Sequence, residues 1–165
     1  MTFPELKVAE KIVKKRNLDF PYIPTLLTFR EGPVLLECFR SLKNNPDLII
    51  FDGQGIAHPR RMGIAAHLGI LLGKASIGCA KSRLYGECKN PGNKKGDFCY
   101  LRSRDGTKIG AVLRTRAGVK PIFVSPGYMI DIEDSIEIVL RCCSKYRIPE
   151  PIRMSHRLSK MANRL

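Results

Sequence analysis

The stretch LIIFDG at residues 48–53 decides the fold class of this chain. Four apolar residues run from Leu48 to Phe51 and end at Asp52-Gly53. A short, continuous apolar run of this kind is typical of a strand buried on both faces in a largely parallel sheet. The sequence therefore predicts an inner strand that ends in a carboxylate.

Helical and extended patterns alternate on both sides of this strand. Helices are predicted from Glu31 to Asn44, with Pro33 in the first turn, over residues 62–72, from the cap Asp131 to about Lys145, and after residues 148–151. Extended runs occupy residues 75–79, 98–114, split by a turn at Asp105-Gly106, and 121–124. Residues 6–20 fit a strand and a helix equally well. The alternation predicts one compact α/β domain over residues 1–165.

The chain has a large excess of positive charge, with 29 Lys and Arg against 15 Asp and Glu and a net charge of +14. Residues 81–120 alone carry +8, whereas residues 121–140 carry −4. Such a surplus favours a polyanionic partner, such as nucleic acid, over a solvated basic surface without a partner. No apolar run approaches the ~20 residues of a membrane span, and the N-terminus lacks the apolar core of a signal peptide. We therefore expect a cytoplasmic protein without a membrane partner.

The six cysteines lack the spacing of a zinc site, because no CxxC pair occurs. We interpret them as reduced, mostly buried thiols. They are Cys38, Cys79, Cys88, Cys99, Cys142 and Cys143.

Two acidic residues are candidates for metal binding. Asp52 is expected at the carboxyl edge of the sheet, where α/β proteins bind ligands and where a carboxylate suits a hard cation. A lone Asp-Gly is also a common turn cap, and Glu31 also stabilises a helix N-terminus by its charge alone. The residues after Asp52 favour a ligand site, because several glycines permit close approach of the backbone. They include Gly53, Gly55, His58, Pro59 and Gly63.

Basic residues and histidines supply further candidates. His58 and His67 are interpreted first as structural histidines, whereas His156 in the last helix is the better functional candidate. Lys81 and Arg83 follow the strand at 75–79 and reach the same sheet edge as Asp52, where they either meet a phosphate or form a solvated loop. The last helix has an apolar row and a basic row, with His156 nearly opposite the apolar one. The rows are Met154, Leu158, Met161 and Leu165, and Arg153, Arg157, Lys160 and Arg164.

Residues 20–24 read Phe-Pro-Tyr-Ile-Pro, a rigid apolar segment bracketed by prolines. It either packs in the core or, in a DNA-binding protein, forms an exposed wedge that holds bases apart. The sequence leaves both interpretations open.

Five strings at consistent spacing resemble the endonuclease V family, and together they span about residues 20–165. They are FPYIPTLLTFREGP (20–33), FDGQGIAHPRRMGIAAHLG (51–69), IGCAKSRLYG (77–86), IFVSPG (122–127) and RIPEPIRMSHRL (147–158). The resemblance implies a ribonuclease H-like α/β fold, with a mixed sheet and flanking helices. It also implies hydrolysis of the second phosphodiester bond 3′ to deoxyinosine in DNA, leaving a 3′-hydroxyl and a 5′-phosphate. The cofactor is expected to be Mg²⁺, with Mn²⁺ able to substitute, and the role is repair of deaminated adenine.

The resemblance also assigns roles to individual positions. Glu31 and Asp52 become metal-binding carboxylates, Lys81 an active-site lysine, and His156 a group beside the metal and the scissile phosphate. Tyr22 becomes the centre of the DNA-binding wedge, with Pro21, Ile23 and Pro24. The pocket for the flipped hypoxanthine is formed by Leu27, Gly53, Gly78 and Leu84. RNA stays open as a second substrate, and the complete protein is expected to be a monomer.

The chain departs from the family pattern at its N-terminus. Family members carry a strand with a metal-binding Asp, and then a second strand, before the wedge, whereas only 19 residues precede Phe20. We expect an N-terminally truncated domain with an open edge beside the missing central strand. Such a chain should be weakly active or inactive and poorly soluble, unless an acidic residue of the N-terminal segment replaces the ligand. The candidates are Glu5, Glu10 and Asp19. The alternative function is a non-catalytic nucleic-acid-binding protein of the same family.

Overall fold

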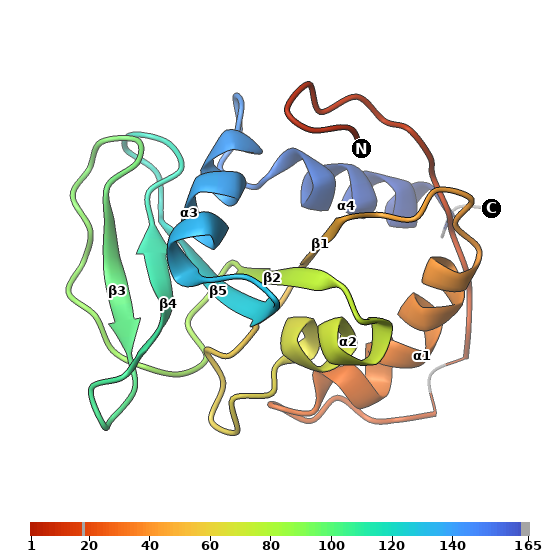
Figure 1. Ribbon diagram of the computed structural model, residues 1–165, viewed down its shortest axis with the longest axis horizontal. Helices are drawn as coiled ribbons and strands as arrows, with labels where there is room; N and C mark the ends of the chain where they lie inside the picture. The colour runs from red at the N-terminus through yellow and green to blue at the C-terminus, as the bar shows by residue number, and fades with distance from the viewer. Residues whose placement is uncertain (18, 163–165) are drawn as a thin grey trace.

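The strand predicted at residues 48–51 is present as β1 (Leu48–Phe51), and it lies at one end of a five-stranded sheet (Figure 1). The structure is a computed structural model that describes residues 1–17 and 19–162. The strand order is β1-β2-β5-β4-β3. The other strands are β2 (Ala75–Ala80), β3 (Phe98–Arg102), β4 (Lys108–Leu113) and β5 (Ile122–Tyr128).

The sheet is mixed, as the family resemblance implied. Only β1 and β2 are parallel, and the other three neighbouring pairs are antiparallel. The prediction of a largely parallel sheet, made from the apolar run alone, is wrong. The prediction that β1 is buried on both faces is also wrong, because Leu48, Ile49 and Ile50 are half-buried and only Phe51 is buried. A strand with a ladder neighbour on one side only leaves its other edge uncovered.

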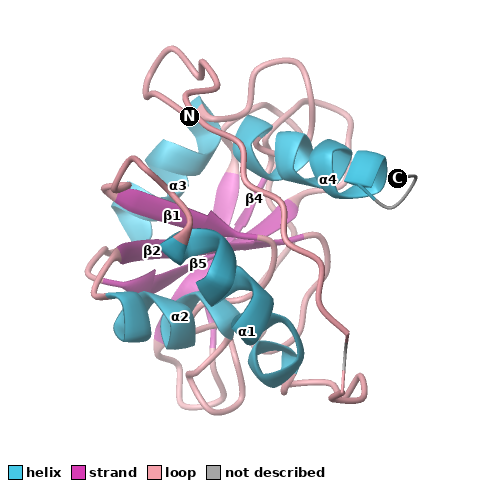
Figure 2. Ribbon diagram, turned by 90° about the vertical axis from the view of Figure 1, so that its right-hand side faces the viewer, coloured by secondary structure: helices cyan, strands magenta, loops and turns pink. Residues whose placement is uncertain are grey.

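Helices cover both faces of the sheet (Figure 2). One face carries α1 (Leu27–Arg40) and α2 (Ile64–Leu72), and the other carries α3 (Ile132–Arg141) and α4 (Glu150–Ala162). Apolar side chains of α3 and α4 pack with those of β2, β4 and β5 into the largest core cluster. A second cluster joins α1 and α2 to Phe51.

The helix boundaries differ from the sequence prediction in position rather than in kind. The first helix begins at Leu27, so Glu31 and Pro33 lie inside α1 and not at its start. The Asp131 cap is confirmed, because its side chain accepts a hydrogen bond of 2.7 Å from the Asp134 amide. The hairpin and the last helix are also confirmed. Arg164 and Leu165 lie outside the described residues.

The N-terminal segment, which the sequence left ambiguous, forms neither a helix nor a strand up to residue 17. It runs past α4 and α1 in an extended path (Figure 2). Glu10 holds it to the end of α1 by accepting from the backbone amides of Lys43 at 3.0 Å and Asn44 at 3.2 Å. Arg16 forms a 2.7 Å ion pair with Glu37. In the part of the chain that the structure describes, no helix is long and apolar enough to cross a membrane.

Candidate active site

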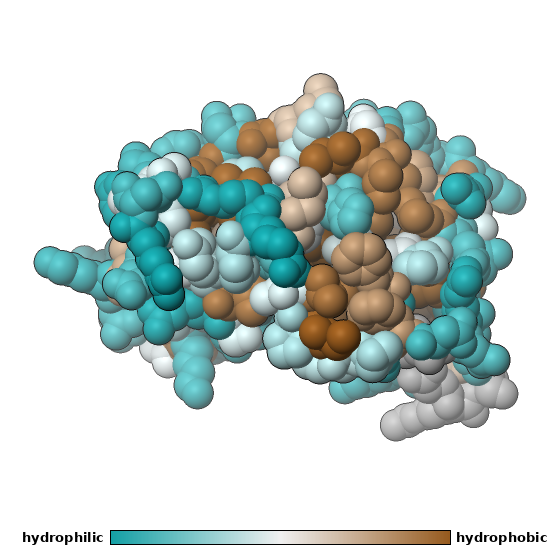
Figure 3. Space-filling model, turned by 90° about the horizontal axis from the view of Figure 1, so that it is seen from below, coloured by the Kyte–Doolittle hydropathy of each residue, from teal (hydrophilic) through white to brown (hydrophobic). Residues whose placement is uncertain are grey.

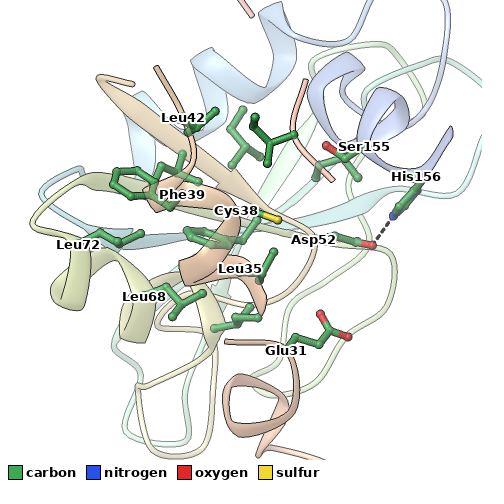
Figure 4. Close-up of a pocket in the computed structure, with 16 residues that line it drawn as sticks. Glu31, Leu35, Cys38, Phe39, Leu42, Asp52, Leu68, Leu72, Ser155 and His156 are labelled. Carbon is green, nitrogen blue, oxygen red and sulfur yellow. Dashed lines mark hydrogen bonds and ion pairs between the residues drawn. The ribbon is translucent and has the colours of Figure 1, made fainter. Parts of the chain in front are cut away.

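The carboxylate of Asp52 is the centre of a small charged cluster. Asp52 follows the last residue of β1, and Lys81 follows the last residue of the adjacent parallel strand β2. The ends of parallel strands meet at one sheet edge, so the two side chains meet there, with Lys81 Nζ 2.8 Å from Asp52 Oδ2. His156 of α4 reaches the same oxygen, and its Nε2 lies 2.6 Å from it (Figure 4). Lys81 Nζ lies 3.4 Å from His156 Nε2. Two residues from distant segments, Lys81 and His156, therefore converge on one oxygen atom of Asp52.

Glu31 is the second acidic group of the site. It projects from α1 into the cavity that Asp52 and His156 also line (Figure 4). Burial raises the pKa of the Glu31 carboxyl, and the nearby charge of Asp52 raises this pKa further, whereas Arg30 opposes the rise. The charge of Asp52 thus disfavours the ionised form of Glu31, and a cation bound by both carboxylates would offset this repulsion.

The donor set of the site suits a hard divalent cation. Carboxylate oxygens are the ligands that Mg²⁺ prefers, and Mg²⁺ commonly takes one or two of them together with water and substrate phosphate. Glu31 and Asp52 supply two. Within residues 1–17 and 19–162, however, no three His, Cys, Asp or Glu side chains form a group that could hold a metal ion. Glu10 does not add a third ligand, because its carboxylate is engaged by Lys43 and Asn44.

The cavity beside the two carboxylates is mostly apolar and has a volume of about 340 Å³. It follows the uncovered side of β1 and reaches α1, α2 and α4, with Ile12 of the N-terminal segment at its border. The polar groups Glu31, Asp52 and His156 lie along its lining. Among the described residues β1 pairs with β2 alone, so its other edge has no strand neighbour, and this edge adjoins the charged cluster.

The segment at residues 20–24 is a surface loop. Pro21, Tyr22, Ile23 and Pro24 are all exposed, with 69% of Tyr22 accessible, so the interpretation as a core-packing loop is wrong for these four. The base of the loop is fixed, because the Thr25 carbonyl accepts from His58 Nε2 at 3.1 Å and from Arg60 Nη2 at 2.8 Å.

His58 has the structural role that the sequence analysis gave it first. It is 2% exposed, and its Nδ1 accepts from the Arg60 amide, so the proton resides on the Nε2 that donates to Thr25. Burial lowers the pKa of His58, and Arg60 lowers it further, while the hydrogen bond to Thr25 opposes them. His67 is half-buried and meets Phe29 edge-on, with ring centroids 6.0 Å apart.

A second cavity of about 190 Å³ lies between the exposed loop and the sheet edge. Three of the four predicted pocket residues line it, namely Leu27, Gly53 and Leu84, and Tyr22 and Arg83 line it as well. Gly78 does not; it lies behind the lining. A Cβ at Gly78 would come within 2.2 Å of the Gly55 nitrogen, so glycine is needed there to let β2 approach residues 53–55.

Among the six thiols, Cys38 lines the larger cavity beside Glu31 and Asp52 (Figure 4). All six cysteines are free, and Cys79, Cys142 and Cys143 are buried, while the other three are half-buried. Burial raises the pKa of Cys143 to about 12, which keeps this thiol protonated and unreactive at neutral pH.

The sequence analysis missed the anchoring of the exposed loop by Arg60 and the contacts of Arg147. Arg147 donates to the Lys81 carbonyl at 3.0 Å, which links it to the charged cluster. Both arginines stand inside strings that the analysis singled out, but a sequence does not show which carbonyl a guanidinium reaches.

The model of the family described as Endonuclease V matches residues 1–157. The chain belongs to the endonuclease V family. The endonuclease V of Dictyoglomus thermophilum is 51% identical over 162 residues, which are 98% of this chain and 71% of that protein. The chain thus matches the greater part, but not the whole, of its endonuclease V relatives.

Solved endonuclease V structures share the fold. The endonuclease V of Streptomyces avermitilis is 41% identical with a TM-score of 0.84, over 89% of this chain and 64% of that one. The endonuclease V of Ciona intestinalis, in complex with a DNA 24mer containing an inosine followed by a ribo-adenosine, is 30% identical with a TM-score of 0.90. That match covers 99% of this chain and 76% of the other. The mixed α/β architecture is thus that of the family, consistent with the ribonuclease H-like fold that the resemblance implied.

Proposed function

We propose that this chain carries the active site of an endonuclease that hydrolyses the second phosphodiester bond 3′ to deoxyinosine, leaving a 3′-hydroxyl and a 5′-phosphate. The observation that carries the proposal is the convergence of Lys81 and His156 on Asp52 Oδ2, at 2.8 and 2.6 Å. A lone turn cap would need neither partner. The proposed role is DNA repair, with Mg²⁺ as the cofactor.

Each residue of the cluster has a proposed task. Glu31 and Asp52 would hold Mg²⁺, which would stabilise negative charge on the attacking and leaving oxygens. The ammonium group of Lys81 lies beside Asp52 and would face the incoming phosphate. His156 would hold or transfer a proton at Nε2, the atom that points at Asp52.

The surface around the cluster supports a DNA substrate. The exposed loop with Tyr22 borders the 190 Å³ cavity, so a base displaced by the wedge would find a pocket beside it. Figure 3 shows the face that carries α1 and α2, where apolar side chains gather between hydrophilic margins. The net charge of +14 suits a polyanion. An endonuclease V relative has been crystallised with inosine-containing DNA.

A second candidate function is inosine-DNA binding without cleavage. The specific observation in its favour is that, among the described residues, no group of three potential ligands could hold a metal ion. Loss of a carboxylate from a Mg²⁺ site weakens retention of the ion and placement of the nucleophile.

Nicking of an inosine-containing duplex in the presence of Mg²⁺ tests the proposal. We expect Asp52→Asn to abolish cleavage in a form of the chain that nicks, with inosine-DNA affinity kept within a few-fold, because shape is kept and charge is lost. The affinity is measured in Ca²⁺ to prevent turnover. Residual nicking within tenfold of the parent would show that Asp52 is not a metal ligand, and salt-sensitive binding without any nicking would favour the second candidate.

A further inference from the structure

The ladder between β2 and β5 ends before it reaches Lys81. Its last residue pair is Ala80 and Phe123, so the carbonyls of Lys81 and Pro121 lie just beyond the regular hydrogen bonds of the sheet. Arg147 supplies the missing donors. Its Nη2 donates to the Lys81 carbonyl at 3.0 Å and to the Pro121 carbonyl at 2.8 Å, and its Nε donates to the Lys120 carbonyl at 2.7 Å.

The backbone of Arg147 is also held in place by a hydrogen bond. The hydroxyl of Thr115, a residue only 1% exposed, donates to the Arg147 carbonyl at 2.7 Å. Arg147 stands between α3 and α4, shortly before Glu150 begins the helix that carries His156. The guanidinium therefore joins the end of β2 to the start of α4.

A planar guanidinium with five N–H donors can donate to carbonyls beyond the ends of two neighbouring strands at once, whereas one ammonium group cannot reproduce that arrangement of donors. An arginine at position 147 thus suits the arrangement of the three carbonyls that it contacts. The N–H groups of a surface arginine without such contacts would hydrogen-bond to water.

We propose that Arg147 is a positioning residue of the active site. It holds the backbone of Lys81 against the segment that begins α4, and so fixes Lys81 Nζ relative to Asp52 and His156. The inference rests on the proposed function only in so far as the three side chains carry catalysis, because the arrangement itself can be measured without substrate.

Arg116 is a matched control. Its Nη1 donates to the Lys145 carbonyl at 3.3 Å, so Arg116→Ala removes the same charge and an arginine–carbonyl contact from the same region. That contact does not involve Lys81.

The test measures the reactivity of individual lysines in the 165-residue chain by trace acetylation and mass spectrometry. An amine engaged in a 2.8 Å ion pair is less available to the reagent, and Asp52→Asn removes the charged partner, so this variant should raise labelling of Lys81 and serves as the positive control. We expect Arg147→Ala and Arg147→Lys each to raise Lys81 labelling at least threefold relative to Lys108, with Arg116→Ala unchanged. Arg147→Lys retains the charge and carries the test if the alanine variant does not fold.

Unchanged Lys81 labelling in a folded Arg147 variant, with a rise in Asp52→Asn, would overturn the proposal. So would an equal rise in Arg116→Ala. In a form of the chain that nicks inosine DNA, Arg147→Ala should lower kcat at least tenfold with KM within threefold. The double variant with Lys81→Ala should lose no more than Lys81→Ala alone, whereas additive losses would contradict action through Lys81. Absence of nicking in every form would refute the nuclease function and leave the labelling result standing.

Discussion

The central strands β4 and β5 and the terminal strand β1 differ in how completely they are packed. In β4 and β5, Leu113, Ile122 and Val124 are at most 1% exposed and lie in the main core. In β1, Leu48, Ile49 and Ile50 are half-buried, and a cavity of about 340 Å³ follows the strand. The carboxylate at the centre of the site nevertheless follows the less well packed strand, β1. Its position depends on contacts from β2 and α4 rather than on the packing of β1.

The largest effect is expected from covering the open side of β1. Adding before residue 1 a strand-forming segment that ends in an Asp should raise Mg²⁺-dependent nicking by more than about 100-fold. Residues that only contact a metal ligand typically change activity by about 10- to 100-fold, and a direct ligand should have a larger effect. The added strand should also favour the monomer, because it covers an unpaired edge.

Activity is checked on an inosine duplex, and mass by light scattering. An added strand carrying Asn instead of Asp is the control; it should restore the monomer and not the activity. Robust turnover by the 165-residue chain alone, as a monomer, would contradict the expectation.

The strands β4 and β1 should differ in their response to truncation of one side chain. Leu113→Ala in β4 should cost about 3 kcal/mol of the free energy of unfolding, within the range for buried leucines. Ile50→Ala beside the cavity should cost about 1 kcal/mol or less, since less apolar surface is buried there. Urea unfolding measures both, and equal costs would mean that β1 is as well packed as β4.

Tyr22→Ala should reduce the preference for inosine over adenine duplex by about 1–3 kcal/mol of binding free energy, the usual value of one stacking contact. General affinity should change less, because it comes from phosphate contacts. Tyr146→Ala is the control, since Tyr146 is an exposed tyrosine away from the loop. Binding titrations on both duplexes decide the matter, and an unchanged ratio in Tyr22→Ala would remove the wedge function.

The smallest effect concerns Glu31. Because its pKa is raised in the folded state, folding favours the protonated form, and the ionised form destabilises the fold at neutral pH. Glu31→Gln should therefore raise the melting temperature at pH 7 by less than about 3 °C, since solvent screens a half-buried group. The gain should disappear below the ordinary pKa of a glutamate, where the parent is also protonated. A lower melting temperature at pH 7 would contradict this sign.

The sequence predicted local elements better than their environment. The apolar run at residues 48–51 correctly indicated a strand ending in Asp52, because that pattern is local. Whether β1 is inner or terminal depends on which strands pair with it, and the apolar run alone does not contain that information. Lys81 was placed at the right edge because it follows a second apolar run. The family resemblance implied that His156 belongs to the same site, but the 3.4 Å contact between the two side chains is seen in the structure alone.

Predictions about the site were also limited because a local sequence pattern does not show which distant segments lie beside it. Gly78 was assigned to the pocket, but the structure places it behind the lining, because a required glycine marks close approach of backbone as readily as contact with a ligand. Arg147 was missed as an anchor because the partners of its guanidinium are main-chain carbonyls, which every residue possesses. Arg60 donates to both the carbonyl and the hydroxyl of Thr25, but the two residues are 35 positions apart, and no local pattern connects them.

The hydrogen bonds at Thr25 have a consequence for the speed of recognition. A loop whose base is fixed before binding loses less conformational entropy when DNA binds, so less of the contact energy is spent on ordering the protein. If Tyr22 is the proposed wedge, it would test successive base steps without a slow loop rearrangement at each one. The rate of a search along DNA would be limited by how often a base pair opens, and a mismatched inosine pair opens more readily than a normal pair.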